Sequence, residues 1–507
     1  MEKIAHRPHM LAAVDLGSNS FRMVIARVVG DELQLVDRLR EGVRLAAYLN
    51  RRQKLSVEGQ HRALECLRKF GQRLREFPPG SVRAVGTNTL RKARNTPGML
   101  QEAHRALGHP IEIVSGREEA RLIFLGVCHS LAGGPEPERR LVVDIGGGST
   151  ECIVGKGFEP KRIESLYMGC VSYTLAHFPK GRIRAKYMRA AETAARLELR
   201  SPKADFKRLG WDRCVGASGT IQAVVEILRQ NGWSDQGITP DGLARLRQTL
   251  LEHDHVDEID LAGLRRDRAR VLPGGVAILS AIFDSLRIER MLVASGAMRE
   301  GVLYDLLGRL RHEDTRDRTI QRFVEQFRVD VEQAKRVEAI ALDCLEQVAG
   351  DWKIDRKVGG AFLAWAAGLH EIGLTVAHAA YHKHGAYLVE HSDMPGFSYQ
   401  NQRMLALLIR GHRRKLPKAL FGEVLTERQA KKAMRLCMLL RLACVLTRSR
   451  SPRQLPDIRL RARGKSLRVA FPEGWLDQHP LTLADLRQEA SYLKPAGLKL
   501  RVSILDP

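Results

Sequence analysis

Hydrophobic and polar residues form strand-like and then helix-like patterns over the first 130 residues. Apolar runs rich in β-branched residues cover 11–17 and 21–29, on either side of a turn of polar residues and glycine, and predict two strands. Apolar positions at helical spacing follow over 56–77, with Ser56 as the expected N-cap. Further strands are predicted over 31–39, 81–86 and 111–115. This alternation is typical of an α/β domain.

The same strand–turn–strand pattern returns over residues 141–155. Asp15, Gly17 and Ser20 of the first turn correspond to Asp144, Gly146 and Ser149, about 129 residues later and at the same internal spacing. A stretch rich in glycine, proline and charge covers 131–140 and predicts a domain boundary near residue 135. The repeat therefore indicates a duplicated domain with a cleft between its halves.

Helical patterns dominate from about residue 310, and a β-like pattern returns over 458–471. At about 150 residues per domain, a chain of 507 residues favours three domains. We therefore predict domains over 1–135, 136–310 and 311–507. The third is expected to be mainly helical, with a small end that contains strands.

Composition narrows the class of protein. A hydrophobic content of 44% with 28% charged residues is typical of a folded soluble chain. No apolar stretch approaches the roughly 18 residues of a membrane span, and residues 1–10 lack the apolar core of a signal peptide. The eight cysteines form no CxxC pair and lie mostly in apolar segments. We expect reduced core thiols in a cytoplasmic protein.

The charge of the chain is strongly positive and unevenly distributed. The formal net charge is +25, and residues 401–470 hold 19 lysines and arginines against 3 acidic residues. Such a field attracts nucleic acid, anionic lipid or a long phosphate polymer. The alternative is a solvated basic surface with no polyanionic partner.

The two turns over 15–20 and 144–150 are candidate phosphate-binding loops. Their glycines let backbone amides approach an anion, and Ser18, Asn19, Ser20 and Ser149 add donors. A carboxylate beside such amides would repel phosphate unless a cation or water lies between them, so Asp15 and Asp144 are predicted ligands of Mg²⁺ or water. The alternative is a pair of hairpin turns capped by aspartate.

Three helix starts add candidate anion sites. Ser218–Gly219 and Ser295–Gly296 each stand where a strand pattern gives way to a helix, and helix N-termini favour anions. Arg91 lies about one turn inside a helix expected to begin at Thr87 or Asn88. There it could clamp a phosphate through two hydrogen bonds, or be an ordinary surface arginine.

Two adjacent glutamates receive different predictions. Ser115 and Glu118 have the spacing of a capping box, in which Glu118 folds back on the cap. Glu119 is left free and shares a helix face with Leu122 and Ile123. A carboxylate over an apolar face is a candidate general base, or simply another acidic residue at a helix start.

The chain resembles the exopolyphosphatase / guanosine pentaphosphate phosphohydrolase family. The resemblance rests on DLGSNSF, GTNTLR, SGREEARLIF, DIGGGSTE, MGCVS, GASGT and SGAMREGVLYDL, which occur in this order over residues 11 to about 310. GLHEIGL, HKHGAYL and SDMPGFS extend it toward the long bacterial exopolyphosphatases. It implies a duplicated actin-like fold of the ribonuclease-H type, Mg²⁺-dependent phosphate release, and a helical HD-like C-terminal domain.

The resemblance also implies roles for single residues. The family's catalytic glutamate falls on Glu119 and its phosphate-binding arginine on Arg91. Its second-loop residues fall on Asp144, Gly146, Gly147, Gly148, Ser149 and Glu151. Cys170 is expected near the cleft, and Arg22 and Arg268 match positions where some members bind the nucleotide or phosphate tail. We expect Glu119 to activate water, and Asp144, Glu151 and Asp15 to hold Mg²⁺.

One feature departs from the HD pattern. Its defining pair reads His370–Glu371, and residues 320–350 offer no histidine as a first metal ligand. We predict a degenerate HD-like scaffold without a metal of its own.

From these features the predicted function is processive hydrolysis of terminal phosphate from inorganic polyphosphate, with the basic residues 401–470 guiding the polymer. The GGGST loop, the HKHGAYL segment and the +25 charge favour it. The alternatives are a guanosine pentaphosphate (pppGpp) 5′-phosphohydrolase, an actin-like ATPase or kinase, and a non-catalytic polyanion-binding protein. We also expect a homodimer, no specific nucleic acid partner, and K⁺ as an optional activator. Peripheral contact with the inner face of the membrane is a further option.

Overall fold

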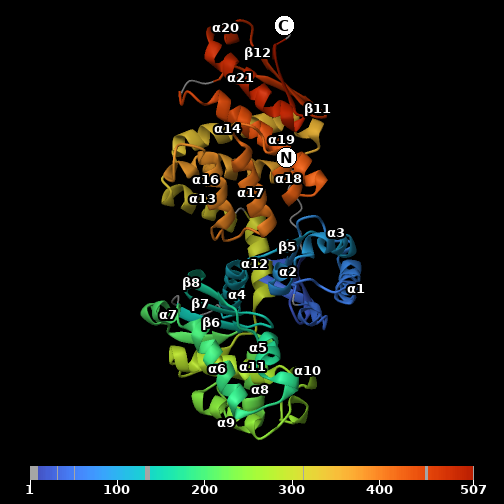
Figure 1. The fold of residues 1–507 in the computed structure, drawn as a ribbon, viewed down its shortest axis with the longest axis vertical. Helices are drawn as coiled ribbons and strands as arrows, with labels where there is room; N and C mark the ends of the chain where they lie inside the picture. Colours follow the sequence, from blue (N-terminus) through green and yellow to red (C-terminus); the bar gives the residue numbers. More distant parts are fainter. Residues whose placement is uncertain are drawn as a thin grey trace. The chain divides into compact units, whose positions relative to one another are not determined.

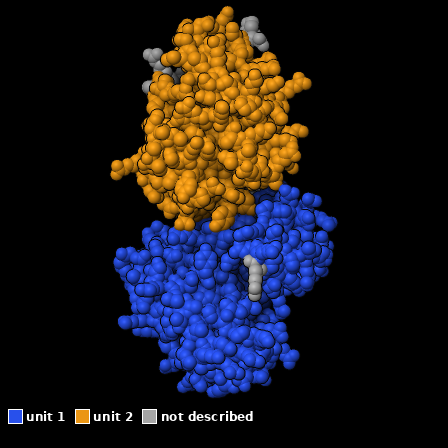
Figure 2. Space-filling view, in the orientation of Figure 1, with its two compact units in different colours: residues 1–314 blue, residues 315–507 orange. Residues whose placement is uncertain are grey.

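The structure is a computed structural model that describes residues 10–30, 32–50, 52–131, 138–311, 313–451 and 455–505. It divides into two compact parts, residues 1–314 and 315–507, which we call unit 1 and unit 2 (Figure 2). The predicted domains 1–135 and 136–310 both fall within unit 1. The boundary predicted near residue 135 lies outside the described residues.

The first half of unit 1 is a mixed five-stranded sheet with its helices. Its elements are β1 Met10–Leu16, β2 Phe21–Val29, β3 Glu32–Glu41, α1 Val57–Leu74, β4 Val82–Gly86, α2 Asn88–Lys92, α3 Thr96–Leu107, β5 Ile111–Ile113 and α4 Gly116–Ser130. The strand order is β3-β2-β1-β4-β5, with β1 antiparallel to β2 and parallel to β4. The strand predictions are confirmed, and the Ser56 hydroxyl caps α1 by accepting a hydrogen bond from the Gly59 amide over 3.2 Å.

The second half of unit 1 repeats this topology. Its elements are β6 Arg139–Ile145, β7 Thr150–Lys156, β8 Glu159–Leu166, α5 Cys170–His177, α6 Ala185–Leu199, α7 Lys203–Leu209, β9 Arg213–Gly216, α8 Gly219–Gln230, α9 Pro240–Leu251, α10 Arg266–Ala269, α11 Leu272–Leu286, β10 Met291–Val293 and α12 Met298–Leu310. The strand order β8-β7-β6-β9-β10 matches that of the first sheet strand for strand. The predicted duplication is therefore confirmed. Figure 1 shows β6, β7 and β8 of this second half side by side.

Helices α4 and α12 join the two halves of unit 1. They share one hydrophobic core with residues of both sheets, among them Leu11 and Val142, which are fully buried. The helices cross at two glycines: a Cβ on Gly126 would collide with the Ala297 carbonyl, and one on Gly301 with the Leu122 carbonyl. This close packing holds the ends of β1 and β6 in one fixed arrangement.

Unit 2 is mainly helical with a small sheet, as predicted. Its elements are α13 Thr315–Gln326, α14 Val331–Trp352, α15 Arg356–Leu369, α16 Tyr381–His391, α17 Tyr399–Gly411, α18 Lys418–Val424, α19 Glu427–Leu446, β11 Arg459–Arg463, β12 Ser466–Phe471, α20 Trp475–Gln478, α21 Pro480–Leu493 and β13 Lys499–Ile504. One hydrophobic core runs through its helices and its sheet, whose order is β11-β12-β13. In the described part of the chain, no helix is long and apolar enough to cross a membrane.

Candidate functional site

A cleft of about 120 Å³ lies in unit 1 where the two sheets present equivalent turns. The turn between β1 and β2 forms one wall and the turn between β6 and β7 the other, and the N-terminal ends of α8 and α12 complete it. Most of the predicted site residues line this cleft: Asp15, Gly17, Ser18, Asn19, Ser20, Arg22, Glu119, Asp144, Gly146, Gly147, Gly148, Ser149, Cys170, Ser218, Gly219 and Arg268. Equivalent positions of a duplicated fold thus converge on one cavity.

Asp15 and Asp144 occupy matching positions near the ends of β1 and β6. Burial raises the pKa of Asp144 to about 6, and the charge of Arg22 opposes the shift. Burial also raises the pKa of Asp15, again against Arg22 and Arg299. The charge of Asp15 adds to the rise at Asp144, so these two half-buried carboxyl groups create a place where a cation is favoured.

Glu119 lies on the first turn of α4 and is 8% exposed. The Arg91 guanidinium donates to its Oε2 atom over 3.2 Å. Burial raises the pKa of Glu119 to about 7, Arg91 lowers it, and the charge of Asp15 adds to the rise. This carboxyl group can therefore hold or release a proton near neutral pH.

Arg91 and Glu118 are placed differently from their predictions. Arg91 is absent from the described residues that line the cleft, because its guanidinium binds the Val114 carbonyl and Glu119. Ser115 does cap α4 by accepting from the Glu118 amide over 3.1 Å. The Glu118 carboxylate, however, does not fold back on the cap: both its oxygens accept from Arg121, at 2.7 and 2.8 Å. That part of the capping-box prediction is wrong.

Glu151 pairs with Asp144 across β6 and β7 but is not among the described residues that line the cleft. It is 1% exposed and accepts a hydrogen bond from the Ser165 hydroxyl over 2.9 Å. Burial, and then the charges of Glu119 and Asp144, raise the pKa of Glu151 well above its ordinary value.

No group of three or more histidine, cysteine, aspartate or glutamate side chains within the described ranges is arranged to hold a metal ion. Asp15 and Asp144 still suit Mg²⁺, which is commonly held by one or two carboxylates together with water and substrate phosphates. Among the three predicted ligands, these two line the cleft and Glu151 does not.

Three arginines line the cleft, and a fourth, Arg40, is near enough for its charge to act on two of them. We call the four the arginine cluster: Arg22, Arg40, Arg268 and Arg299. Burial lowers the pKa of Arg22, Asp15 opposes that shift, and the charges of Arg299 and Arg40 add to it. The Arg268 guanidinium lies directly over Gly219 at the start of α8. The cluster offers a strongly cationic surface beside the two phosphate turns.

Sequence reasoning missed three of the residues at this site. Arg299 follows the Ser295–Gly296 pair that was predicted as an anion site, although the helix itself begins at Met298. Arg40 gave no sequence signal: it lies near the end of β3, its guanidinium pairs with Asp267 over 3.4 Å, and it acts on Arg22 and Arg268 through its charge. Asn88 was considered only as a cap, yet it lines the cleft and its buried Nδ2 atom has no hydrogen-bond partner among the described residues.

Cys170 begins α5 beside the second turn, as predicted. Its amide donates to the Gly146 carbonyl over 2.9 Å, and a Cβ on Gly169 would collide with the backbone of Gly147 and Gly148. Burial raises the pKa of the Cys170 thiol. The residue therefore supports the shape of the turn rather than offering a nucleophile. All eight cysteines are unpaired, and seven of them are buried.

The predicted HD-like pair lies in unit 2. His370 is buried, its Nδ1 atom lies 2.7 Å from the Ala367 carbonyl oxygen, and its ring meets that of His412 edge to face at 5.6 Å. Glu371 forms a short ion pair with Arg450. Both residues therefore have structural partners.

Comparison with family models and with known sequences identifies relatives of the whole chain. The Ppx/GppA phosphatase family model matches residues 24–310, and the model of Ppx/GppA phosphatase domain III matches 315–490. A guanosine-5′-triphosphate,3′-diphosphate pyrophosphatase of Vibrio vulnificus is 41% identical over 97% of this chain and 97% of its own. A protein of the same name from Vibrio parahaemolyticus is 39% identical over 97% of this chain and 98% of its own.

Solved structures agree on the fold of unit 1. An Aquifex aeolicus Ppx/GppA protein has 25% identity and a TM-score of 0.51, covering 60% of this chain and 99% of its own. An exopolyphosphatase from Cytophaga hutchinsonii has 22% identity and a TM-score of 0.54, covering 60% of this chain and 98% of its own. The predicted actin-like fold is therefore confirmed.

The prediction of an exopolyphosphatase is wrong, because the two relatives that match nearly the full length carry the pyrophosphatase name. The features that favoured polyphosphate do not separate the two substrates, since a guanosine with both a triphosphate and a diphosphate is itself a polyanion.

Proposed function

The chain belongs to the Ppx/GppA phosphatase family, and we propose that it hydrolyses the terminal phosphoanhydride of guanosine-5′-triphosphate,3′-diphosphate (pppGpp). The products are orthophosphate and the guanosine 5′-diphosphate,3′-diphosphate. The observation that carries this proposal is the full-length identity of 41% to a relative named for that substrate. The geometry of the cleft supplies the chemistry that such a reaction needs.

The terminal phosphate fits between the two turns. Gly147 and Gly148 present their backbone without side chains, and the Ser149 hydroxyl and the unpaired Nδ2 atom of Asn88 lie beside them. These groups would contact the non-bridging oxygens of the phosphate, where charge must be stabilised during transfer. A Cβ on Gly148 would press on the Asn88 amide, so the turn and Asn88 form one continuous surface.

Glu119 is the base of the proposed reaction. Its ionised carboxylate would accept a proton from a water molecule, whose oxygen then bonds to the terminal phosphorus while the bond to the bridging oxygen breaks. The departing diphosphate takes up the negative charge. Arg91 is a positioning residue, because it holds the Oε2 atom of Glu119 and also lowers the pKa of that carboxyl.

Asp15 and Asp144 would hold Mg²⁺ together with the substrate's phosphates and water. When bound, the ion would neutralise charge on the phosphate oxygens. A cation would favour the ionised form of both carboxyl groups, because burial raises the pKa of each and the charge of Asp15 adds to the rise at Asp144. Activation by K⁺ stays a prediction.

The arginine cluster would bind the 3′-diphosphate. Three of its guanidinium groups line the cleft with the phosphate turns, and a guanidinium can bind a phosphate through two parallel hydrogen bonds. A linear polyphosphate has no second phosphate arm, so this surface favours a branched substrate.

The test compares substrates side by side. The purified chain with Mg²⁺ is given pppGpp, GTP or inorganic polyphosphate, and released phosphate and the nucleotide product are measured by anion-exchange chromatography. We expect one phosphate per pppGpp, no further breakdown of the product, and the highest kcat/KM for pppGpp. A higher kcat/KM for polyphosphate, or no turnover of pppGpp, would overturn the proposal.

A further inference from the structure

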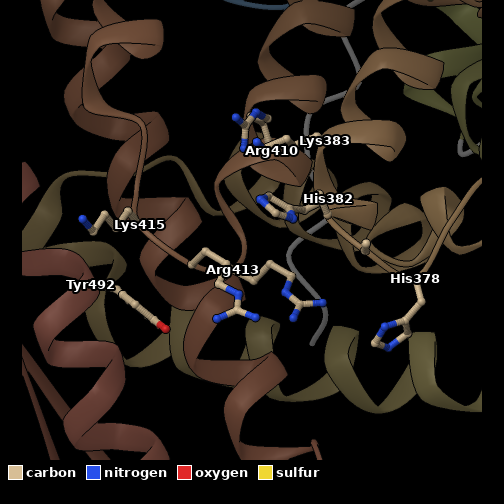
Figure 3. Close-up of a pocket in the computed structure, with 10 residues that line it drawn as sticks. His378, His382, Lys383, Arg410, Arg413, Lys415 and Tyr492 are labelled. Carbon is tan, nitrogen blue, oxygen red and sulfur yellow. The ribbon is translucent and has the colours of Figure 1, made fainter.

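Unit 2 contains a cavity of about 640 Å³ whose wall is strongly cationic. Its lining includes five basic side chains: Lys383, Arg410, Arg413, Arg414 and Lys415. No aspartate or glutamate of the described chain lines it. Figure 3 shows the arginine and lysine side chains around the opening, with His382 between Arg410 and Arg413.

The cavity forms where the start of α16 meets the loop that follows α17. Lys383 comes from the first turn of α16, and Arg413, Arg414 and Lys415 from the loop. Arg441, which is fully buried on α19, fixes this loop: its guanidinium donates to the Gly411 and Arg414 carbonyls and pairs with Glu489. The buried Arg441–Glu489 ion pair therefore stabilises the conformation of the basic loop in the absence of a ligand.

The cations of the cavity lack acidic partners. No ion pair joins any of the five basic residues to a carboxylate within the described ranges. Arg413 instead lies over the Tyr381 ring, 4.4 Å from its centroid. Positive charges that line one concave wall repel one another, and a bound anion reduces that repulsion.

His382 adds a buried polar group to the same wall. It is 5% exposed, and its Nδ1 atom has no hydrogen-bond partner among the described residues. Burial, and then the charges of Arg410 and Arg413, lower the pKa of His382 to about 4. The imidazole is therefore neutral at pH 7, and it leaves the charge of the cavity to the lysines and arginines.

We propose that this cavity binds a small anion that carries two or more phosphate groups. The volume is that of a site for a small organic ligand. Five cations in one wall match several negative charges close together, and mixed lysines and arginines are typical phosphate ligands. A nucleic acid strand would need an open groove with aromatic stacking surfaces, whereas this site is a pocket with Tyr492 as the aromatic residue in its described lining.

The cavity belongs to unit 2 alone, and the proposed catalytic cleft belongs to unit 1. It is therefore a second phosphate site, separate from the residues that carry hydrolysis. Its ligand can be a nucleotide or an inorganic diphosphate, since both present the same linked phosphates.

The experiment uses the full chain and methylenediphosphonate, a diphosphate analogue whose P–C–P bridge is not hydrolysed. Hydrogen exchange is measured over residues 378–383 and 410–415, so that binding in unit 2 is separated from binding in unit 1. The pocket variant Lys383→Gln/Lys415→Gln is compared with Lys465→Gln/Lys499→Gln, which removes the same charge from exposed positions outside the cavity. Guanosine 5′-(β,γ-methylene)triphosphate and a short single-stranded RNA are tested in the same way.

We expect the analogue to slow exchange in both segments, and the pocket variant to weaken that binding about tenfold or more. The control variant should bind as the unaltered chain does, and pppGpp hydrolysis without added ligand should be unchanged in both variants. A stronger effect of the guanosine analogue than of methylenediphosphonate would identify a nucleotide as the ligand. Absence of protection, equal weakening in the two variants, or protection by RNA alone would overturn the proposal.

Discussion

The Arg91 guanidinium and the Glu119 carboxylate form a hydrogen bond of 3.2 Å that links α2 to α4 beside the cleft. Arg91 is held from its other side by the Val114 carbonyl at 2.8 Å, so the pair is fixed in one geometry. Burial raises the pKa of Glu119 and the ion pair with Arg91 lowers it. Burial has the larger effect, and the pKa rises to about 7. A base of this strength can take a proton from water and return it near neutral pH.

Removing the carboxylate of Glu119 should abolish chemistry while leaving binding intact. We expect Glu119→Gln to lower kcat by roughly 10²–10⁴-fold with little change in substrate affinity. The matched control is Glu118→Gln on the same helix turn, whose carboxylate binds Arg121 and lies 3.6 Å from Arg83. It should lower the free energy of unfolding by about 3–5 kcal/mol and spare kcat in the folded fraction. Equal loss of kcat in both variants would contradict the assignment.

Loss of Arg91 should change the pH profile. Since Arg91 lowers the pKa of Glu119, Arg91→Gln should raise that pKa, and the acidic limb of kcat/KM against pH should move to higher pH. Arg91→Lys should restore the limb in part, because it keeps the charge. A variant that loses activity equally at every pH would show that Arg91 acts through binding or stability alone.

A buried charge network should control the acid stability of unit 1. Asp305 accepts from Arg83 over 2.6 Å and from Arg309 over 2.9 Å, and it also binds Arg121. These arginines hold the pKa of Asp305 well below its ordinary value. Asp305 therefore contributes fully to the free energy of unfolding at pH values above its unfolded pKa of about 3.9, and this contribution is lost as the pH falls below that value.

We expect Asp305→Asn to lower the free energy of unfolding by about 3–5 kcal/mol at pH 7, with a smaller deficit at pH 3. Asp284→Asn, which removes an exposed partner of Arg196, should cost no more than about 1 kcal/mol. Urea unfolding across this pH range measures both. A loss of unfolding free energy that grows as the pH is lowered would contradict the prediction.

The same network shows why sequence reasoning could place Glu119 at the cleft but not the carboxylate of Glu118. The repeat of Asp15 and Asp144 and the start of α4 are local patterns, and they were enough to locate the cleft. Glu118 binds Arg121, three residues along the same helix, and Arg121 also binds Asp305, which lies 184 residues away in the chain. Packing of α12 against α4 creates that contact, and no spacing along the sequence reports it.

The basic residues 401–470 were misread for a related reason. Arg441 is buried under the loop after α17, Arg435 lies over Trp352, and Arg448 pairs with Asp485. These residues stabilise unit 2 and cannot guide a polymer. The excess charge over this range therefore overstates the number of basic side chains that are available to bind a ligand. Only some of these side chains line the cavity described above.

The arginine cluster should separate pppGpp from nucleotides without a 3′-diphosphate. We expect Arg268→Gln to raise the KM for pppGpp about tenfold or more, since it removes a charged hydrogen bond to phosphate, and to leave GTP hydrolysis nearly unchanged. Arg265→Gln is the control, because Arg265 is exposed and already pairs with Asp267. Equal losses for GTP and pppGpp in the Arg268 variant would place this arginine on the shared 5′ chain instead.

Metal dependence distinguishes the three acidic residues once predicted as a single ligand set. EDTA should stop turnover and Mg²⁺ should restore it. Asp144→Asn should raise the Mg²⁺ concentration required, because the Asp144 carboxylate faces the cleft. Glu151→Gln should not raise it, because Glu151 is buried, is not part of the cleft lining and already binds Ser165. A Glu151→Gln variant that needs as much added Mg²⁺ as Asp144→Asn would show that Glu151 joins the metal site when the ion binds.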